Sequence, residues 1–114
     1  MPHIIVEYSK DLADAIDVQT LVNGLHETLG KALGDTGRIK SRAYAAGHFA
    51  EGEKGADGAF IHITLLLLED RDLQTKKQYA QPLHDLAQLM ARTAIPDCAV
   101  TLEVRDMDKD SYFL

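Results

Sequence analysis

The stretch AFIHITLLLL, residues 59–68, ends in an uninterrupted run of four leucines and decides the arrangement of the rest. It is short, it is rich in β-branched and other apolar residues, and a glycine-containing stretch precedes it. These features predict a strand. Apolar residues fall at both odd and even positions, which is typical of a strand covered on both faces. We therefore expect 59–68 to be covered on both sides.

The first half of the chain predicts a strand, a helix and a second strand. The strands are His3–Tyr8 and Ile39–Phe49. Between them, apolar residues three and four positions apart indicate one face of a helix, with Asp17 as its N-cap and Gly34 at its end. That face consists of Val18, Leu21, Val22, Leu25, Leu29 and Leu33. Glu51–Gly58, with three glycines and several charges, predicts a turn or an exposed hairpin loop.

The second half repeats the cycle after the strand at 59–68. A helix is predicted over Leu73–Ala91 and a last strand over Ala99–Met107. Pro82 lies inside the helical pattern, and we expect it to kink the helix or shift its start, because proline lacks the N–H and crowds the preceding turn. The order is β-α-β-β-α-β, which indicates two pseudo-repeats, about 2–50 and 59–107, in a single domain of 114 residues.

This order predicts an α/β (α+β) fold made of two βαβ units. Right-handed crossovers place both helices on one face of a four-stranded sheet. The other face is left open, and a 12.6 kDa domain with an exposed apolar sheet face is expected to oligomerise through it. A ferredoxin-like fold has the same element order with interleaved strands, so the order alone leaves both folds open.

Charge and composition exclude several classes of partner. The net charge is −6, from 12 Lys+Arg against 18 Asp+Glu, and this argues against a nucleic-acid partner. A few arginines in a pocket would still attract a small anionic substrate. No apolar run is long enough to cross a bilayer and the start does not resemble a signal peptide, so we expect a cytoplasmic protein with no membrane partner. Cys98 is the only cysteine, and we expect a buried thiol.

Pro2 is the first candidate for chemistry. A methionine followed by a small residue such as proline is normally removed, and this would expose a secondary amine. Desolvation and nearby cations lower the pKa of an amine, which makes it a usable general base. The alternative is that Pro2 simply follows the start codon. The sequence has no metal-ligand spacing among its histidines, no glycine-rich phosphate loop and no nucleophile elbow, which leaves cofactor-free proton transfer as the simplest chemistry.

Three cations are candidates for binding a substrate. Arg71 follows the third predicted strand, where substrate-binding groups often lie in open α/β sheets, and its guanidinium suits a carboxylate. The alternative is an exposed residue paired with Asp70 or Asp72. Lys40 and Arg42 lie two apart in the second strand and so share one of its faces, which could also be an ordinary exposed face.

Four stretches resemble the 5-carboxymethyl-2-hydroxymuconate isomerase family of the tautomerase superfamily: PHIIVE (2–7), IKSR (39–42), AFIHITL (59–65) and the segment around Arg71. The resemblance spans nearly the whole chain. It implies a homotrimeric, cofactor-independent isomerase whose chain is equivalent to two fused short tautomerases. It also implies that Pro2 is the base and acid, that Arg71 binds a carboxylate, and that the substrate is a small dicarboxylate or tricarboxylate from homoprotocatechuate breakdown.

The chain departs from the family at one site position. The second site arginine of the family falls at Lys40, and lysine keeps the charge but lacks the bidentate fork. Arg42 matches an arginine of the motif and could assist. Pro82 is a further departure. Two alternative functions stay open at this point: a related tautomerase acting on another unsaturated 2-hydroxy acid, and a non-catalytic, ferredoxin-like ligand-binding domain.

Overall fold

Four strands form one mixed sheet in the computed structural model, with the order β2-β1-β3-β4. They are β1 (His3–Ser9), β2 (Lys40–Ala46), β3 (Phe60–Leu68) and β4 (Ala99–Met107). β1 is parallel to β2 and antiparallel to β3, and β3 is parallel to β4. The two strands of each βαβ unit are therefore neighbours. A ferredoxin-like sheet would separate them by another strand, so that alternative is wrong.

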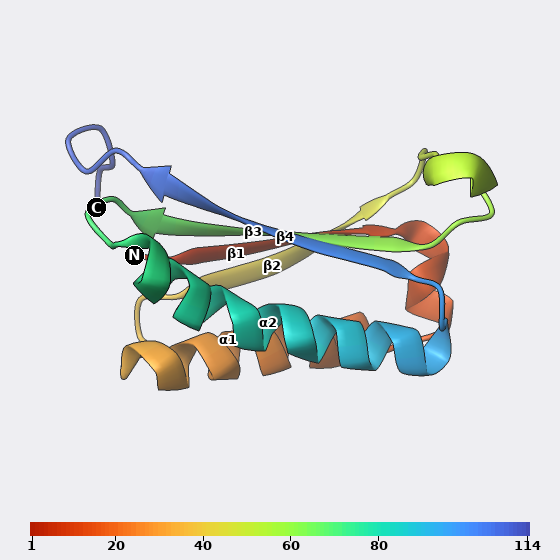
Figure 1. The fold of residues 1–114 in the computed structure, drawn as a ribbon, viewed down its shortest axis with the longest axis horizontal. Helices are drawn as coiled ribbons and strands as arrows, with labels where there is room; N and C mark the ends of the chain where they lie inside the picture. The colour runs from red at the N-terminus through yellow and green to blue at the C-terminus, as the bar shows by residue number, and fades with distance from the viewer.

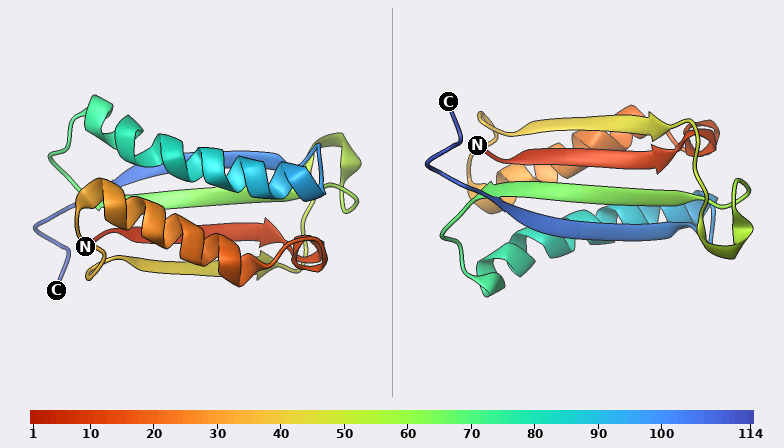
Figure 2. Two further views of the ribbon diagram at one scale, coloured as in Figure 1. Left: turned by 90° about the horizontal axis from the view of Figure 1, so that it is seen from below. Right: turned by 90° about the horizontal axis from the view of Figure 1, so that it is seen from above.

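Two long helices, α1 (Val18–Leu33) and α2 (Leu73–Ala94), cover the same face of the sheet (Figures 1 and 2). Short 3-10 helices, η1 (Lys10–Asp14) and η2 (Gly52–Lys54), lie in connecting segments. α1 begins as predicted, because the Asp17 carboxylate accepts a hydrogen bond from the Thr20 N–H at 3.2 Å. It ends at Gly34, whose φ of 73° lies in the left-handed region that glycine tolerates best.

Two element boundaries differ from the sequence prediction by three residues, and the other differences are of one residue. β2 ends at Ala46 and not at Phe49, because its partner strand β1 ends opposite it: Ser9 pairs with Ala46, and the chain then enters η1. α2 starts at Leu73 as predicted and continues past Ala91 to Ala94, so the expected shift of its start by Pro82 is wrong.

Pro82 is accommodated inside α2 because it lies on the exposed side of the helix. In a regular helix the carbonyl oxygen of Gln78, four positions earlier, would accept a hydrogen bond from the N–H that proline lacks. Gln78 is exposed as well. Water can therefore satisfy the Gln78 carbonyl group, and the helix continues on both sides of the proline.

The hydrophobic core lies between the sheet and the two helices. Alternate residues of β3 are fully buried in it, and so is one face of α1 that includes Leu21, Leu25 and Leu29. The buried residues of β3 are Ile61, Ile63, Leu65 and Leu67. Cys98 is buried in this core, as predicted, and burial raises the pKa of its thiol.

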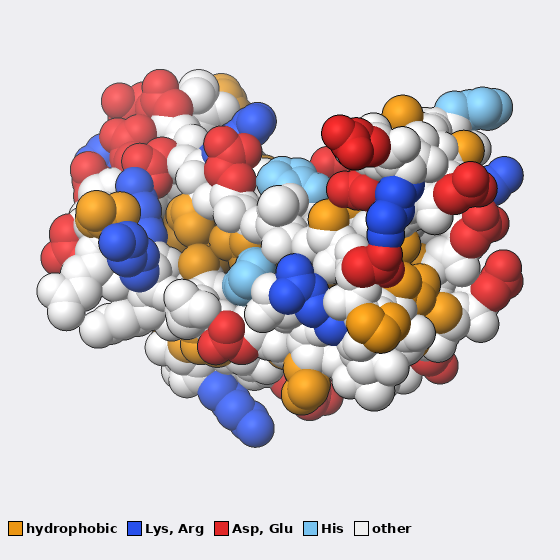
Figure 3. All heavy atoms as spheres, turned by 45° about the vertical axis from the view of Figure 1, so that its right-hand side comes forward, with side chains coloured by type: hydrophobic (Ala, Val, Ile, Leu, Met, Phe, Trp, Pro, Cys, Tyr) orange, Lys and Arg blue, Asp and Glu red, His pale blue; other side chains and the backbone are white.

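The opposite face of the sheet is covered by no helix (Figure 2). The prediction that 59–68 is covered on both faces is therefore wrong for the single chain. The open face is also more polar than expected: His62 and Thr64 of β3 are half-buried there, beside Glu103 and Arg105 of β4. In Figure 3 the open face is uppermost. It is hollowed between two raised ends, and acidic side chains gather at these ends.

The helices carry no signature of a membrane span. Neither α1 nor α2 combines the length and the apolar character that crossing a bilayer requires.

Candidate functional site

Pro2 lies at the start of β1, the inner strand that runs between β2 and β3. The residue is buried, and its carbonyl oxygen accepts a hydrogen bond from the Lys40 N–H at 3.1 Å, which fixes it beside the start of β2. Because β1 and β3 are antiparallel, Pro2 lies at the end of the sheet where β3 ends and from which the chain continues into α2. Both termini of the chain lie at this edge (Figure 1).

A cavity of about 190 Å³ surrounds the start of the chain. Three segments build it: the first two residues, the end of α1 with the loop to β2, and the loop from β3 to α2. Its lining residues are Met1, Pro2, Leu33, Asp35, Arg38 and Arg71. The structure therefore brings together two of the residues singled out from sequence, Pro2 and Arg71, and adds Arg38.

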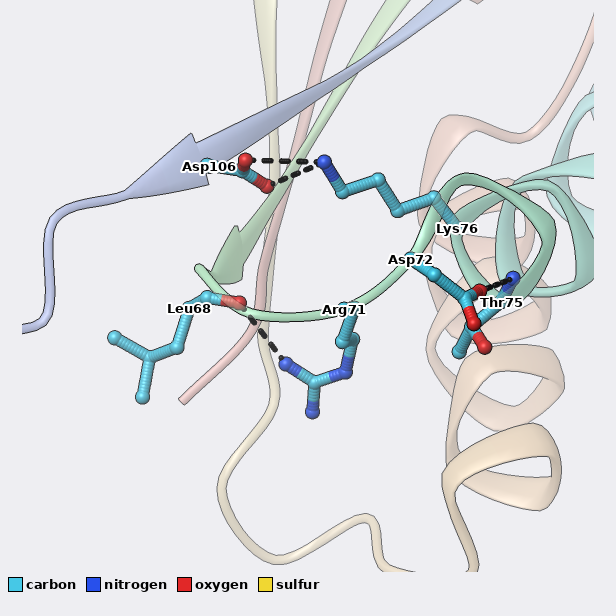
Figure 4. Close-up of polar contacts among 6 residues, drawn as sticks. All are labelled: Leu68, Arg71, Asp72, Thr75, Lys76 and Asp106. Atoms are coloured by element: carbon cyan, nitrogen blue, oxygen red, sulfur yellow. Dashed lines mark hydrogen bonds and ion pairs between the residues drawn. The ribbon is translucent and has the colours of Figure 1, made fainter.

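Arg71 is held in a defined position in the loop between β3 and α2. Its Nη1 donates a hydrogen bond to the Leu68 carbonyl oxygen at 3.2 Å, and its guanidinium carbon lies 5.8 Å from the centroid of the Tyr79 ring. Figure 4 shows the guanidinium turned back toward the end of β3. An arginine positioned by its own protein contacts loses little conformational freedom when it binds an anion.

Asp70 and Asp72, the acidic neighbours of Arg71 in the sequence, interact with groups other than Arg71. Asp70 forms an ion pair with Lys109, with 2.6 Å between Oδ2 and Nζ. Asp72 is the N-cap of α2, and its carboxylate accepts a hydrogen bond from the Thr75 N–H at 2.8 Å (Figure 4). The alternative that Arg71 is neutralised by one of these aspartates is therefore wrong.

Lys40 and Arg42 share one face of β2, as their spacing predicted, and this is the open face, but neither residue lines the cavity. Both line a groove along the outer edge of β2, beside α1. Arg42 is hydrogen-bonded to His3, with 3.0 Å between Nη1 and Nδ1. The positive charge of Lys40 is nevertheless close enough to lower the pKa of the Met1 amino group.

Sequence reasoning missed Arg38. The residue lies in the loop just before β2, outside every predicted element and outside the stretches that resemble the family. The signal that would have found it is the pairing of the strands: β1 and β2 are parallel with His3 opposite Lys40, so residues that precede β2 lie beside residues that precede β1.

The electrostatic environment of the cavity favours a neutral amine and a bound anion. The pKa of the amino group of Met1 is lowered, first by burial and then by the positive charges of Arg71, Arg38 and Lys40, while Asp35 opposes the shift. None of these three cations forms an ion pair. A protein with a net charge of −6 therefore carries a local positive field at this edge of the sheet.

A second cavity, of about 260 Å³, lies at the opposite edge of the sheet, where β1 ends and β3 begins. It occupies the place that corresponds to the Pro2 cavity in the other βαβ unit. Asp11, Asp57 and Asp97 line it, and Lys54 in the same cavity is already paired with Asp97. This cavity has no chain terminus and no unpaired cation, so it is not suited to an anionic substrate.

His3 contacts the C-terminal segment of the chain, which follows β4, on the open face of the sheet. Its Nε2 lies 2.8 Å from the Tyr112 hydroxyl, and the two rings meet edge to face with centroids 5.9 Å apart. The guanidinium of Arg42 has only donors, so His3 Nδ1 must accept, and the ring proton lies on Nε2. Burial, followed by the charges of Arg42, Lys40 and the chain amino group, lowers the pKa of His3.

This arrangement predicts a defined pH dependence of stability. The lowered pKa means that the unfolded chain binds a proton more readily than the folded one, so the free energy of unfolding should fall as the pH drops below about 6.5, the ordinary pKa of histidine. Denaturant unfolding from pH 5 to pH 8, at one protein concentration, measures it. The His3→Asn variant should lack this component. His48→Asn, at an exposed ring without a hydrogen bond, is the matched control, and equal pH dependence in both variants would contradict the assignment.

Comparison with known proteins connects this geometry to a family. The family model described as 5-carboxymethyl-2-hydroxymuconate isomerase matches residues 2–113, almost the whole chain. The chain belongs to this family. The protein is accordingly an enzyme, an isomerase of the tautomerase type. No group of His, Cys, Asp or Glu side chains in this isomerase is arranged to hold a metal ion.

Solved structures of other proteins show the same fold. A 5-carboxymethyl-2-hydroxymuconate delta-isomerase has a TM-score of 0.87 at 19% identity, covering 100% of this chain and 87% of that one. The isomerase from Deinococcus radiodurans R1 has a TM-score of 0.83 at 19% identity, covering 99% and 87%. A fused 4-OT that forms a symmetric trimer has a TM-score of 0.67 at 11% identity, covering 95% and 88%. A sequence search of curated proteins found no significant match.

Proposed function

We propose that this isomerase converts 5-carboxymethyl-2-hydroxymuconate to its 2-oxo isomer, with the amine of Pro2 as both base and acid. One observation carries the proposal: the cavity at the start of β1 joins Pro2 to the unpaired cation Arg71 in surroundings that lower the pKa of an amine. Removal of Met1 turns the Pro2 nitrogen from an amide into a secondary amine in these same surroundings.

The reaction needs one proton carrier and no cofactor. The neutral Pro2 amine removes the proton of the 2-hydroxyl group, and the electron pair of the broken O–H bond is delocalised along the diene as a dienolate. The protonated amine then gives that proton to a carbon of the chain. An O–H bond is broken and a C–H bond is formed, and Pro2 returns to its neutral form.

Arg71 binds a carboxylate of the substrate through its fork of donors and stabilises the negative charge of the dienolate. Its contacts with Leu68 and Tyr79 hold it in place before the substrate arrives, so it need not reorganise during the reaction. Lys40 adds positive charge to the site. Arg42 lies on the open face, hydrogen-bonded to His3, and assists the binding of the substrate carboxylates only indirectly.

A panel of unsaturated 2-hydroxy acids tests the proposed activity. Met1-free protein should turn over 5-carboxymethyl-2-hydroxymuconate with the highest kcat/KM of the panel. Higher kcat/KM for another dienol acid would support instead the second candidate, a related tautomerase, which the replacement of the family arginine by Lys40 favours. Absence of turnover with every dienol acid would contradict the proposal.

We also propose that the enzyme is a cytoplasmic homotrimer whose open sheet faces pack around a common centre. The open face has half-buried apolar residues such as Ile5, Leu66 and Leu68 that no helix covers, and a structural relative forms a symmetric trimer. Light scattering should give about 38 kDa, three times 12.6 kDa. A stable monomer at micromolar concentration would refute this assembly.

A further inference from the structure

The cavity around Pro2 contains an arginine that neither the motifs nor the resemblance indicates. We infer that Arg38, and not Lys40, is the second carboxylate-binding residue of this enzyme. The inference rests on the proposed function, because it assigns a residue of that same site. It makes Arg38 a residue that determines which acids the enzyme accepts.

The sheet order places the two arginines on either side of Pro2. β1 lies between β2 and β3. Arg38 comes two residues before β2, and Arg71 comes three residues after β3. One guanidinium therefore approaches the start of β1 from the β2 side and the other from the β3 side, and both line the same cavity as Pro2. A substrate with a carboxylate at each end can reach both while its middle lies at Pro2.

Lys40 is directed to a different place. It is the first residue of β2 and pairs with His3, so its side chain lies on the open face of the sheet. The groove that it lines runs along the outer edge of β2, beside Gln19 and His26 of α1, and contains neither Pro2 nor Arg71. Lys40 contributes charge to the site from a distance, whereas Arg38 lines the cavity itself.

Arg38 is free to bind an anion. It is exposed, it forms no ion pair, and its one side-chain hydrogen bond is a weak one from Nη1 to the Met1 sulfur at 4.0 Å. Removal of Met1 would therefore release this guanidinium together with the Pro2 amine. The one acidic residue that lines the cavity, Asp35, accepts a hydrogen bond from the Gly37 N–H at 2.8 Å.

The chemistry of arginine and lysine supports the assignment of carboxylate binding to Arg38 and not to Lys40. A guanidinium binds a carboxylate through two parallel hydrogen bonds, and an ammonium group cannot reproduce this geometry. Arg38 thus restores, from the loop before β2, the bidentate contact that lysine at position 40 lacks. Its exposed position also lets it follow carboxylates at different distances from Pro2, whereas Arg71 is held by Leu68.

The test compares Arg38→Gln with Lys40→Gln in Met1-free protein, on a dicarboxylate, 2-hydroxymuconate, and on a monocarboxylate, 2-hydroxypenta-2,4-dienoate. Arg38→Gln should raise KM for the dicarboxylate by about tenfold to hundredfold, as expected for lost hydrogen bonds to a charged group. For the monocarboxylate the change should be less than about threefold, and Arg38→Lys should recover only part of the loss. Lys31→Gln, at an exposed lysine of α1 that lines neither cavity, is the control for the loss of one positive charge.

A binding measurement separates this inference from the proposed function. Muconate lacks the 2-hydroxyl proton and cannot react, so calorimetric titration reports on carboxylate binding alone. Weaker muconate binding by Arg38→Gln than by Lys40→Gln would support the role of Arg38 even if Pro2 proved not to be the base. An active enzyme in which Arg38→Gln binds muconate like the wild type, or in which Lys40→Gln has the larger effect, would overturn it.

Discussion

Protein that carries residues before Pro2 should lose nearly all of its isomerase activity, and removal of those residues should restore it fully. In the extended chain the Pro2 nitrogen is an amide, which has neither basicity nor a proton. Loss of a general base costs about 10²- to 10⁴-fold, so kcat/KM should fall by at least a hundredfold. A chain with a protease-cleavable extension ending just before Pro2, assayed before and after cleavage, measures this on one preparation.

Two controls accompany this experiment. Intact mass must show a single species in each sample, because a small fraction of trimmed protein would mimic residual activity. Circular dichroism should be the same in both, since the extension lies outside β1 and the core. Equal turnover by homogeneous extended and trimmed protein would end the assignment of Pro2 as the base.

The second large effect is expected from Arg71→Ala. It should lower kcat/KM by about 10²- to 10³-fold, the usual cost of removing a group that stabilises developing negative charge. KM should rise and kcat should fall together, because the carboxylate contact exists in the ground state and strengthens as the dienolate forms. Steady-state kinetics of the variant on the best substrate of the dienol panel measures both.

The same variant should move the pH profile. Among the charged groups, Arg71 lowers the pKa of the Met1 amino group most. Once Met1 is removed the Pro2 amine is the amino terminus beside Arg71, so the loss of this charge should shift the ionisation seen in kcat/KM to higher pH. Arg71→Lys is the matched control: it keeps the charge and thus the position of the ionisation, but loses the bidentate contact and part of the activity. Wild-type kinetics in Arg71→Ala would remove Arg71 from the site.

Local chemistry made much of the fold predictable. The cap at Asp17, the stop at Gly34 and the whole of the last strand, Ala99–Met107, follow from residue types and periodicity that act over a few positions. The proximity of Pro2 and Arg71 agrees with the family resemblance, which implies that both residues act on one substrate.

The remaining features depend on how strands pair, which periodicity does not determine. β2 stops at Ala46 because β1 stops at Ser9, and this requires the register of the pair. The same register brings Arg38 beside Pro2. Arg42 was predicted to share a face with Lys40, which is correct, but its bond to His3 depends on a neighbouring strand that residue spacing within β2 cannot reveal.

The central claim is that the Pro2 amine is the catalytic base, and the pH titration of its nitrogen tests this most directly. In Met1-free protein labelled with ¹⁵N-proline, the NMR shift of the Pro2 nitrogen should titrate well below the pH at which a proline amine titrates in a short peptide. The rise of kcat/KM with pH should have the same midpoint, because only the neutral amine accepts the substrate proton. A nitrogen that titrates as in the peptide, or a kcat/KM that does not follow its titration, would contradict the account.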